Sequence, residues 1–85
     1  MSLIISGASS QTLGMDHVKS VLLSSSSGNA EVVITNTSSV VVLNLNCGAN
    51  SAVQWAMPGQ VGGTFHFDRN STVSVTGSGA FLRID

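Results

Sequence analysis

Apolar and polar residues alternate with a period of two along most of this chain. The alternating stretches are 31–35, 41–47, 53–57, 64–68, 72–76 and 80–85. A strand with one buried face shows this pattern, because successive side chains point to opposite sides of a sheet. In the clearest stretch, 41–47, the residues assigned to the buried side are Val41, Leu43, Leu45 and Cys47.

Two segments near the start of the chain are less regular. Residues 18–23 fit a strand or a short helix, and we favour a strand because the segment leads into four serines. Residues 3–6 fit an opening strand. Short strands spaced roughly 8–12 residues apart are typical of a sandwich or barrel. We therefore predict an all-β fold: one antiparallel β-sandwich over 1–85, with about seven or eight strands and a jelly-roll or immunoglobulin-like arrangement.

The segments between these strands are rich in turn-forming residues. Ser, Gly, Asn, Asp, Pro and Thr predominate in these segments, which are 24–29, 35–39, 47–51, 57–59, 62–63, 68–71 and 77–79. Proline followed by glycine in Met57-Pro58-Gly59 fits a turn that needs a positive φ at its third position. The glycine-rich segment 59–63 has no Lys-Ser/Thr sequence after it, so it predicts a hairpin turn with a bulge and not a phosphate-binding loop.

Composition excludes several classes of protein. The chain has 85 residues, of which 42% are hydrophobic and 8% charged, and its net charge is -1. The high hydrophobic content argues against a disordered chain. The small negative net charge argues against electrostatic binding to nucleic acid. No apolar run reaches the roughly 20 residues that a membrane-spanning helix needs. The single cysteine, Cys47, has neutral neighbours and predicts a buried thiol in a protein made in a reducing cytoplasm.

Few residues suit catalysis. His66 and Asp68 lie two positions apart, so one strand face could present both, and Asp16 with His17 could join them to bind a metal. Two ligands fall short of the three or four that zinc takes. We keep a small metalloenzyme as a hypothesis, but predict that the chain is not an enzyme and has no catalytic residue, metal or cofactor.

The near absence of charge indicates that some surfaces are covered by other subunits. Lys19 is the only lysine available to protect a sheet edge, and small domains without disulfides are often stabilised by oligomerisation. Phe81 points outward if its neighbours in 80–84 point inward, and Arg83 on the same face could pair with a carboxylate of a partner. The predicted interface residues are Val40, Val42, Phe81 and Arg83.

Trp55 is the residue on which an alternative function depends. An exposed tryptophan could stack on a sugar, which would indicate a receptor- or carbohydrate-binding module of a tail fibre or adhesin. Trp55 alternates in register with Val53 and Met57, and this pattern favours packing in the core or at an interface.

Several segments together resemble small all-β structural proteins of tailed bacteriophages. A valine-rich strand ending in Asn-Thr over 31–37 is followed by a bulky apolar strand and a Gly/Asn loop over 40–50. A Pro-Gly turn at 57–59 precedes an aromatic strand at 63–67, and a Gly-Ser-Gly hairpin closes the chain within 73–84. The resemblance covers most of 30–85 and lies in the pattern, with no diagnostic motif.

This resemblance implies a virion component made in the host cytoplasm. The expected role is a capsid decoration (cement) protein, or a small head or tail accessory protein, that binds coat subunits or other virion proteins. Such proteins act as homo-oligomers, with a trimer favoured, and neither nucleic acid nor membrane is expected as a partner. The family pattern carries no catalytic motif, so no site residue is transferred from it.

Overall fold

The computed structural model describes residues 3–56 and 65–85, and the side chains of 3–55 and 66–85. Within these ranges the chain forms strands joined by turns, and no helix is long and apolar enough to cross a membrane. The strands are β1 (Leu3–Ser6), β2 (Ser9–Thr12), β3 (His17–Val18), β4 (Ser20–Ser25), β5 (Ala30–Thr35), β6 (Val41–Cys47), β7 (Ser51–Ala56), β8 (Phe65–His66), β9 (Thr72–Thr76) and β10 (Ala80–Ile84).

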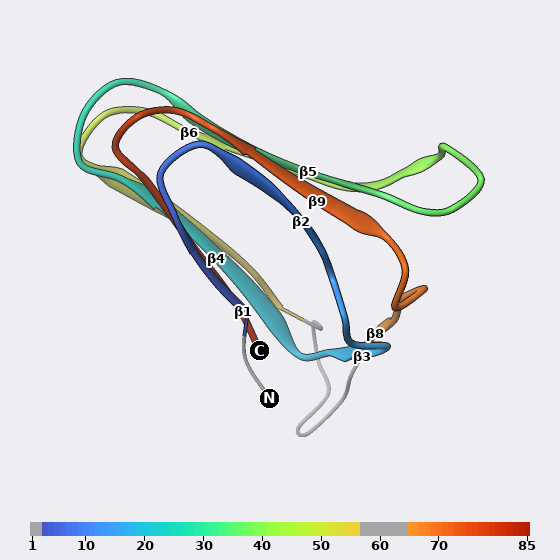
Figure 1. Ribbon diagram of the computed structural model, residues 1–85. Helices are drawn as coiled ribbons and strands as arrows, with labels where there is room; N and C mark the ends of the chain where they lie inside the picture. Colours follow the sequence, from blue (N-terminus) through green and yellow to red (C-terminus); the bar gives the residue numbers. More distant parts are fainter. Residues whose placement is uncertain (1–2, 57–64) are drawn as a thin grey trace.

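Eight of these strands form two four-stranded antiparallel sheets. The first sheet, sheet A, has the order β1-β10-β4-β7, and the second, sheet B, has the order β2-β9-β5-β6. Two strands that are joined by a short turn, such as β1 and β2, hold the same position in the strand orders of the two sheets. Each of these turns therefore carries the chain from one sheet to the other. Figure 1 shows these turns gathered at one end of the sandwich.

This strand order selects between the two predicted arrangements. When β3 and β8 are left out and the other eight strands are numbered 1 to 8 along the chain, the order is 1-8-3-6 in sheet A and 2-7-4-5 in sheet B. This is the strand order of a double-sheet jelly roll. An immunoglobulin-like sandwich keeps several hairpins within a sheet. The prediction of a small all-β sandwich is confirmed, and the short pair β3-β8 lies outside its two sheets.

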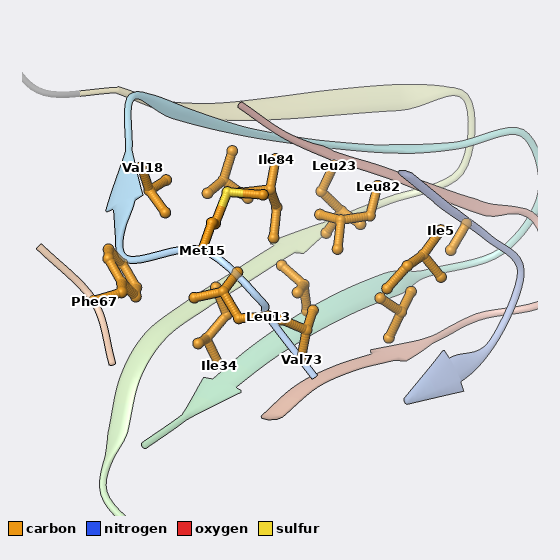
Figure 2. Packing of buried hydrophobic residues seen from close by; sticks show 14 of the residues in the cluster. Ile5, Leu13, Met15, Val18, Leu23, Ile34, Phe67, Val73, Leu82 and Ile84 are labelled. Carbon is orange, nitrogen blue, oxygen red and sulfur yellow. The ribbon is translucent and has the colours of Figure 1, made fainter. Parts of the chain in front are cut away.

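The core lies between the sheets, and the alternation in the sequence explains which residues fill it. Burial alternates along β4, β5 and β10 as the period-two pattern predicts. Figure 2 shows side chains from both sheets packed together, including Leu23 and Leu82 facing Ile34 and Val73. The buried apolar residues are Ile5, Leu13, Met15, Val18, Val21, Leu23, Ala30, Val32, Ile34, Phe67, Val73, Val75, Ala80, Leu82 and Ile84.

The prediction for Val41 is wrong, and a β-bulge explains the error. Ile34 lies opposite Leu43, whereas Thr35 lies opposite Val41, so Val42 is an extra residue in β6. A bulge interrupts the alternation of a strand. Both Val41 and Val42 are therefore exposed, while Leu43, Leu45 and Cys47 keep the predicted inward side and are half-buried.

Three further sequence predictions need adjustment. The segment 18–23 is extended, as favoured, but Lys19 separates β3 from β4. The predicted turn at 24–29 begins later, because β4 continues to Ser25, whose hydroxyl donates to the carbonyls of Ser27 and Gly28. Of the predicted strand at 64–68, residue 64 lies outside the described residues, β8 covers Phe65–His66, and Asp68 follows the strand. The predicted turns at 57–59 and 62–63, together with Met57, lie outside the described residues.

Candidate functional site

The two histidines lie side by side because β3 pairs with β8. His17 is the register partner of His66, and their ring centroids are 5.2 Å apart in an edge-to-face arrangement. The Nδ1 atom of His17 is 3.2 Å from Oδ1 of Asp16, and Nη2 of Arg69 is 4.0 Å from the same oxygen. The pKa of the Asp16 carboxyl is lowered, chiefly by its hydrogen bond with His17. The positive charge of Arg69 lowers it further, to a smaller extent.

Asp68 is engaged elsewhere. The Thr37 hydroxyl donates a 2.7 Å hydrogen bond to its Oδ2, and the backbone N–H of Asn70 donates to its Oδ1 at 3.0 Å. These bonds, with the Thr37 bond first, lower the pKa of Asp68. Within the described part of the chain, no group of three or more His, Cys, Asp or Glu could hold a metal ion. The four residues of the metalloenzyme hypothesis therefore do not converge as one set of ligands.

A surface pocket of about 290 Å³ lies beside Asp68, between the β5–β6 turn and the segment that follows β8. Its lining residues are Asn36, Val42, His66, Phe67, Asp68 and Ser71. Asn36 shapes the turn, since its Oδ1 accepts hydrogen bonds from the backbone N–H groups of Ser38 and Val40. Sequence reasoning placed His66 and Asp68 together, but missed Asn36 and Ser71, which look like ordinary turn residues in a chain rich in Asn and Ser.

The polar side chains that line the pocket differ in what they contact. Ser71 is fully buried, and its Oγ has no hydrogen-bond partner among the described residues. The Asp68 carboxylate already accepts bonds from Thr37 and Asn70. Val42, an exposed apolar residue, also lines the pocket.

Val42 belongs to an exposed apolar surface that we call the valine patch, consisting of Val40, Val41 and Val42. Their exposed fractions are 55%, 55% and 45%, large for aliphatic side chains. The bulge in β6 and the capped turn at 36–40 bring all three to the surface. The sequence predicted Val40 and Val42 as contact residues and missed Val41, because the bulge could not be read from the alternation.

A second exposed apolar surface lies on the outer face of sheet A, and we call it the Ile4–Phe81 patch. Ser6 is the register partner of Phe81, and Ile4 is the partner of Arg83, so the two apolar side chains lie diagonally across β1 and β10. Ile4 is 56% exposed and Phe81 38%. The outward orientation of Phe81 agrees with the sequence pattern. Ile4 was missed because its short strand gave no clear inner face.

Arg83 lies beside this patch but already has an acidic partner. Its Nε is 3.0 Å from Oδ2 of Asp85, two residues further along the chain. A carboxylate of another protein would therefore compete with Asp85 for the guanidinium. The four predicted interface residues do not form one surface: Val40 and Val42 lie at the β6 end of sheet B, and Phe81 and Arg83 lie on sheet A.

Trp55 does not form an exposed aromatic platform. Its side chain is half-buried against the core, and its ring meets that of buried Phe67 edge to face with centroids 6.2 Å apart. This packing is the arrangement that the alternation of Trp55 with Val53 predicts. It does not favour the alternative of a carbohydrate-binding module that stacks sugars on Trp55.

Comparisons with known proteins add no assignment: no family model, curated protein or solved structure matches the chain.

Proposed function

We propose that this chain is a non-enzymatic structural protein of a bacteriophage virion, one that binds the assembled coat lattice and stabilises it. The observation that carries the proposal is the presence of two separate exposed apolar surfaces, the valine patch on sheet B and the Ile4–Phe81 patch on sheet A. Clustered exposed apolar residues mark contact surfaces more often than single ones do. A rigid sandwich with two such surfaces can contact two neighbouring subunits at once.

The nearly neutral surface suits a role in assembly. With three basic and four acidic residues, the chain attracts partners weakly through charge. Attachment through apolar contacts depends little on salt, because ionic screening acts on charges and not on buried apolar area. In this proposal the chain works as a homo-oligomer, bound to coat subunits or other virion proteins, without a cofactor.

Stabilisation follows from linkage. A protein that binds the assembled lattice but not the separated coat subunits shifts the equilibrium towards the lattice by its binding free energy. Each contact can be modest, since several attached copies or several attachment points act together. The two patches supply attachment points without any catalytic chemistry.

The experiment that tests this proposal uses virions from the virus that encodes the chain. Particles are purified by density-gradient centrifugation in high salt, and the ratio of the chain to the coat protein is measured by quantitative mass spectrometry. The proposal predicts a fixed ratio that survives high salt. Absence of the chain from purified particles contradicts it.

Two surface variants sharpen this test. Val42→Ser and Phe81→Ser each remove exposed apolar area, and we expect each to weaken attachment to particles by roughly tenfold, in line with the value of a buried aliphatic or aromatic group. Thr12→Ser, at an exposed position on edge strand β2, is the matched control and should bind as the original chain does. Unchanged binding by both apolar variants contradicts the assignment of the patches.

A further inference from the structure

The two open sides of the sandwich end differently. On one side lie β1 and β2, and on the other lie β6 and β7. The inner positions of β2 are polar: Ser9 and Gln11 are the register partners of buried Val75 and Val73. The chain then turns inward, burying Leu13 and Met15 in the core. On this side Leu3 of β1 is the one apolar residue among the described ones that packs on the core and stays half-exposed.

The β6–β7 side leaves apolar side chains half covered. The inward residues of these strands pack against the core yet remain half-exposed; they are Leu43, Leu45, Cys47, Val53 and Trp55. Among the described strands, β6 pairs with β5 alone and β7 with β4 alone. Natural proteins protect such edges with charge or proline, but the segments 41–47 and 51–56 contain neither.

The sequence of β6 matches itself in reverse. From residue 43 to residue 47 it reads Leu-Asn-Leu-Asn-Cys, a palindrome of apolar and amide side chains centred on Leu45. When a strand pairs antiparallel with its own copy about Leu45, Leu43 lies opposite Cys47 of the copy, and Asn44 opposite its Asn46. The inward apolar side chains of one copy then lie opposite inward apolar side chains of the other, and the outward amides of the two copies lie opposite each other. A two-fold interface requires this self-complementarity.

We propose that the β6–β7 edge is the interface between two copies of this chain, formed by antiparallel pairing of β6 with its copy about Leu45. The pairing extends sheet B across the interface and covers the half-exposed core residues of β6. The bulge at Val42 ends the regular part of the strand, so pairing is confined to 43–47 and leaves the valine patch outside the interface.

A second copy fits this edge better than a charged partner does. The strands of this edge, β6 and β7, carry no charged side chain for another protein to complement, while each copy presents the same neutral pattern. On the outer face, Asn46 donates a 2.8 Å hydrogen bond to Asn44, which donates to Glu31 at 3.0 Å. Amide groups of the second copy can extend this row across the axis.

This inference rests on the homo-oligomer in the proposed function and specifies its contact. A two-fold contact gives a dimer, in place of the trimer that the resemblance to phage proteins implies. Light scattering of the full chain over a range of concentrations should therefore give a mass approaching twice 8.7 kDa. A constant monomer mass or a trimer mass overturns the inference.

Two matched charge variants test the register. In the double variant Asn44→Lys/Asn46→Lys, each new lysine lies opposite a lysine of the copy. In the double variant Asn44→Glu/Asn46→Lys, each new lysine lies opposite a glutamate of the copy. We expect the dissociation constants of the dimers to differ by about tenfold or more, the glutamate-containing variant being tighter. In both variants the lysine introduced at position 46 faces Glu31 within its own chain, and circular dichroism checks that both stay folded. Equal affinities contradict the register.

A cross-link gives an independent test. In Leu43→Cys, the new thiol lies opposite native Cys47 of the copy, at a separation suited to a disulfide. Within one chain the two thiols lie four residues apart along an extended strand, roughly 13 Å, which is too far to bridge. Oxidation should give a covalent dimer with Leu43→Cys, but not with the original chain or with Gln11→Cys on edge strand β2. Equal cross-linking of all three contradicts the pairing.

These outcomes are independent of the virion proposal. A chain that dimerises through β6 but is missing from particles refutes the virion role alone. A chain that is present in particles but stays monomeric in solution, with no cross-link, refutes the edge pairing alone.

Discussion

The hydroxyl of Thr37 donates a 2.7 Å hydrogen bond to the Oδ2 of Asp68, joining two turns that lie 31 residues apart in the chain. The bond fastens the turn before the valine patch to the segment after β8, beside the pocket. It is the largest cause of the lowered pKa of Asp68, whose ordinary value is 3.8.

Acid should weaken this link between the turns. Because the folded-state pKa of Asp68 is lowered, its contribution to stability is present above the unfolded value of about 3.8 and is lost as the pH falls through the folded value. Thr37→Val removes the donor, so the pKa of Asp68 should rise towards its ordinary value. Carboxyl NMR titration measures it, with Thr12→Val as control. An unchanged Asp68 pKa in Thr37→Val contradicts the role of the bond.

The buried face of β10 should contribute far more to stability than its outer face. Leu82 is fully buried between the sheets, and Leu82→Ala should lower the free energy of unfolding by about 2–5 kcal/mol. Phe81→Ala, one position along on the exposed face, should cost much less. Urea unfolding followed by circular dichroism compares the two variants, and equal losses contradict the assignment of faces.

Two buried serines should respond differently to the loss of their hydroxyls. Ser25→Ala removes bonds to the carbonyls of Ser27 and Gly28 and should cost about 0.5–1.5 kcal/mol. Ser71→Ala removes a buried hydroxyl with no partner among the described residues, so it should be neutral or stabilising. Denaturant unfolding measures both changes. A loss in Ser71→Ala as large as that in Ser25→Ala shows that the Ser71 hydroxyl has a stabilising partner.

The turn between β9 and β10 should tolerate no side chain at Gly77. This glycine has a φ of 114°, and a Cβ added to it meets the backbone oxygen of Asn29 at 2.6 Å. Gly28 also has a positive φ, 69°, but open space around it. Gly28→Ala should therefore cost about 1 kcal/mol through backbone strain alone, and Gly77→Ala more, because Asn29 must also shift. Thermal unfolding that ranks them the other way contradicts the close approach.

The sequence predicted the buried faces well because alternation reports directly on the side of a sheet that a residue faces. Val32 with Ile34, and Leu82 with Ile84, are buried as the pattern requires. The pattern could not supply the bulge that exposes Val41, since a bulge depends on pairing between strands. It also could not choose between the jelly-roll and immunoglobulin-like arrangements, because strand order is set by long-range contacts.

The site was harder to predict than the fold for the same reason. His66 and Asp68 were recognised by their spacing, yet Asp68 is bound to distant Thr37. The pocket forms where the turn shaped by Asn36 meets the segment that contains Ser71, two parts of the chain far apart in sequence. Phe81 and Val42 were correctly expected to be exposed, but their distribution over two sheets required the topology.

The thermal stability of virions with and without this chain tests the proposed lattice-stabilising role most directly. Particles from a virus that lacks the gene are heated in parallel with complete particles, and genome release is followed with a fluorescent DNA dye. The predicted result is release at a lower temperature without the chain, and recovery when purified chain is added back to saturation. Identical release temperatures for the two kinds of particle contradict it.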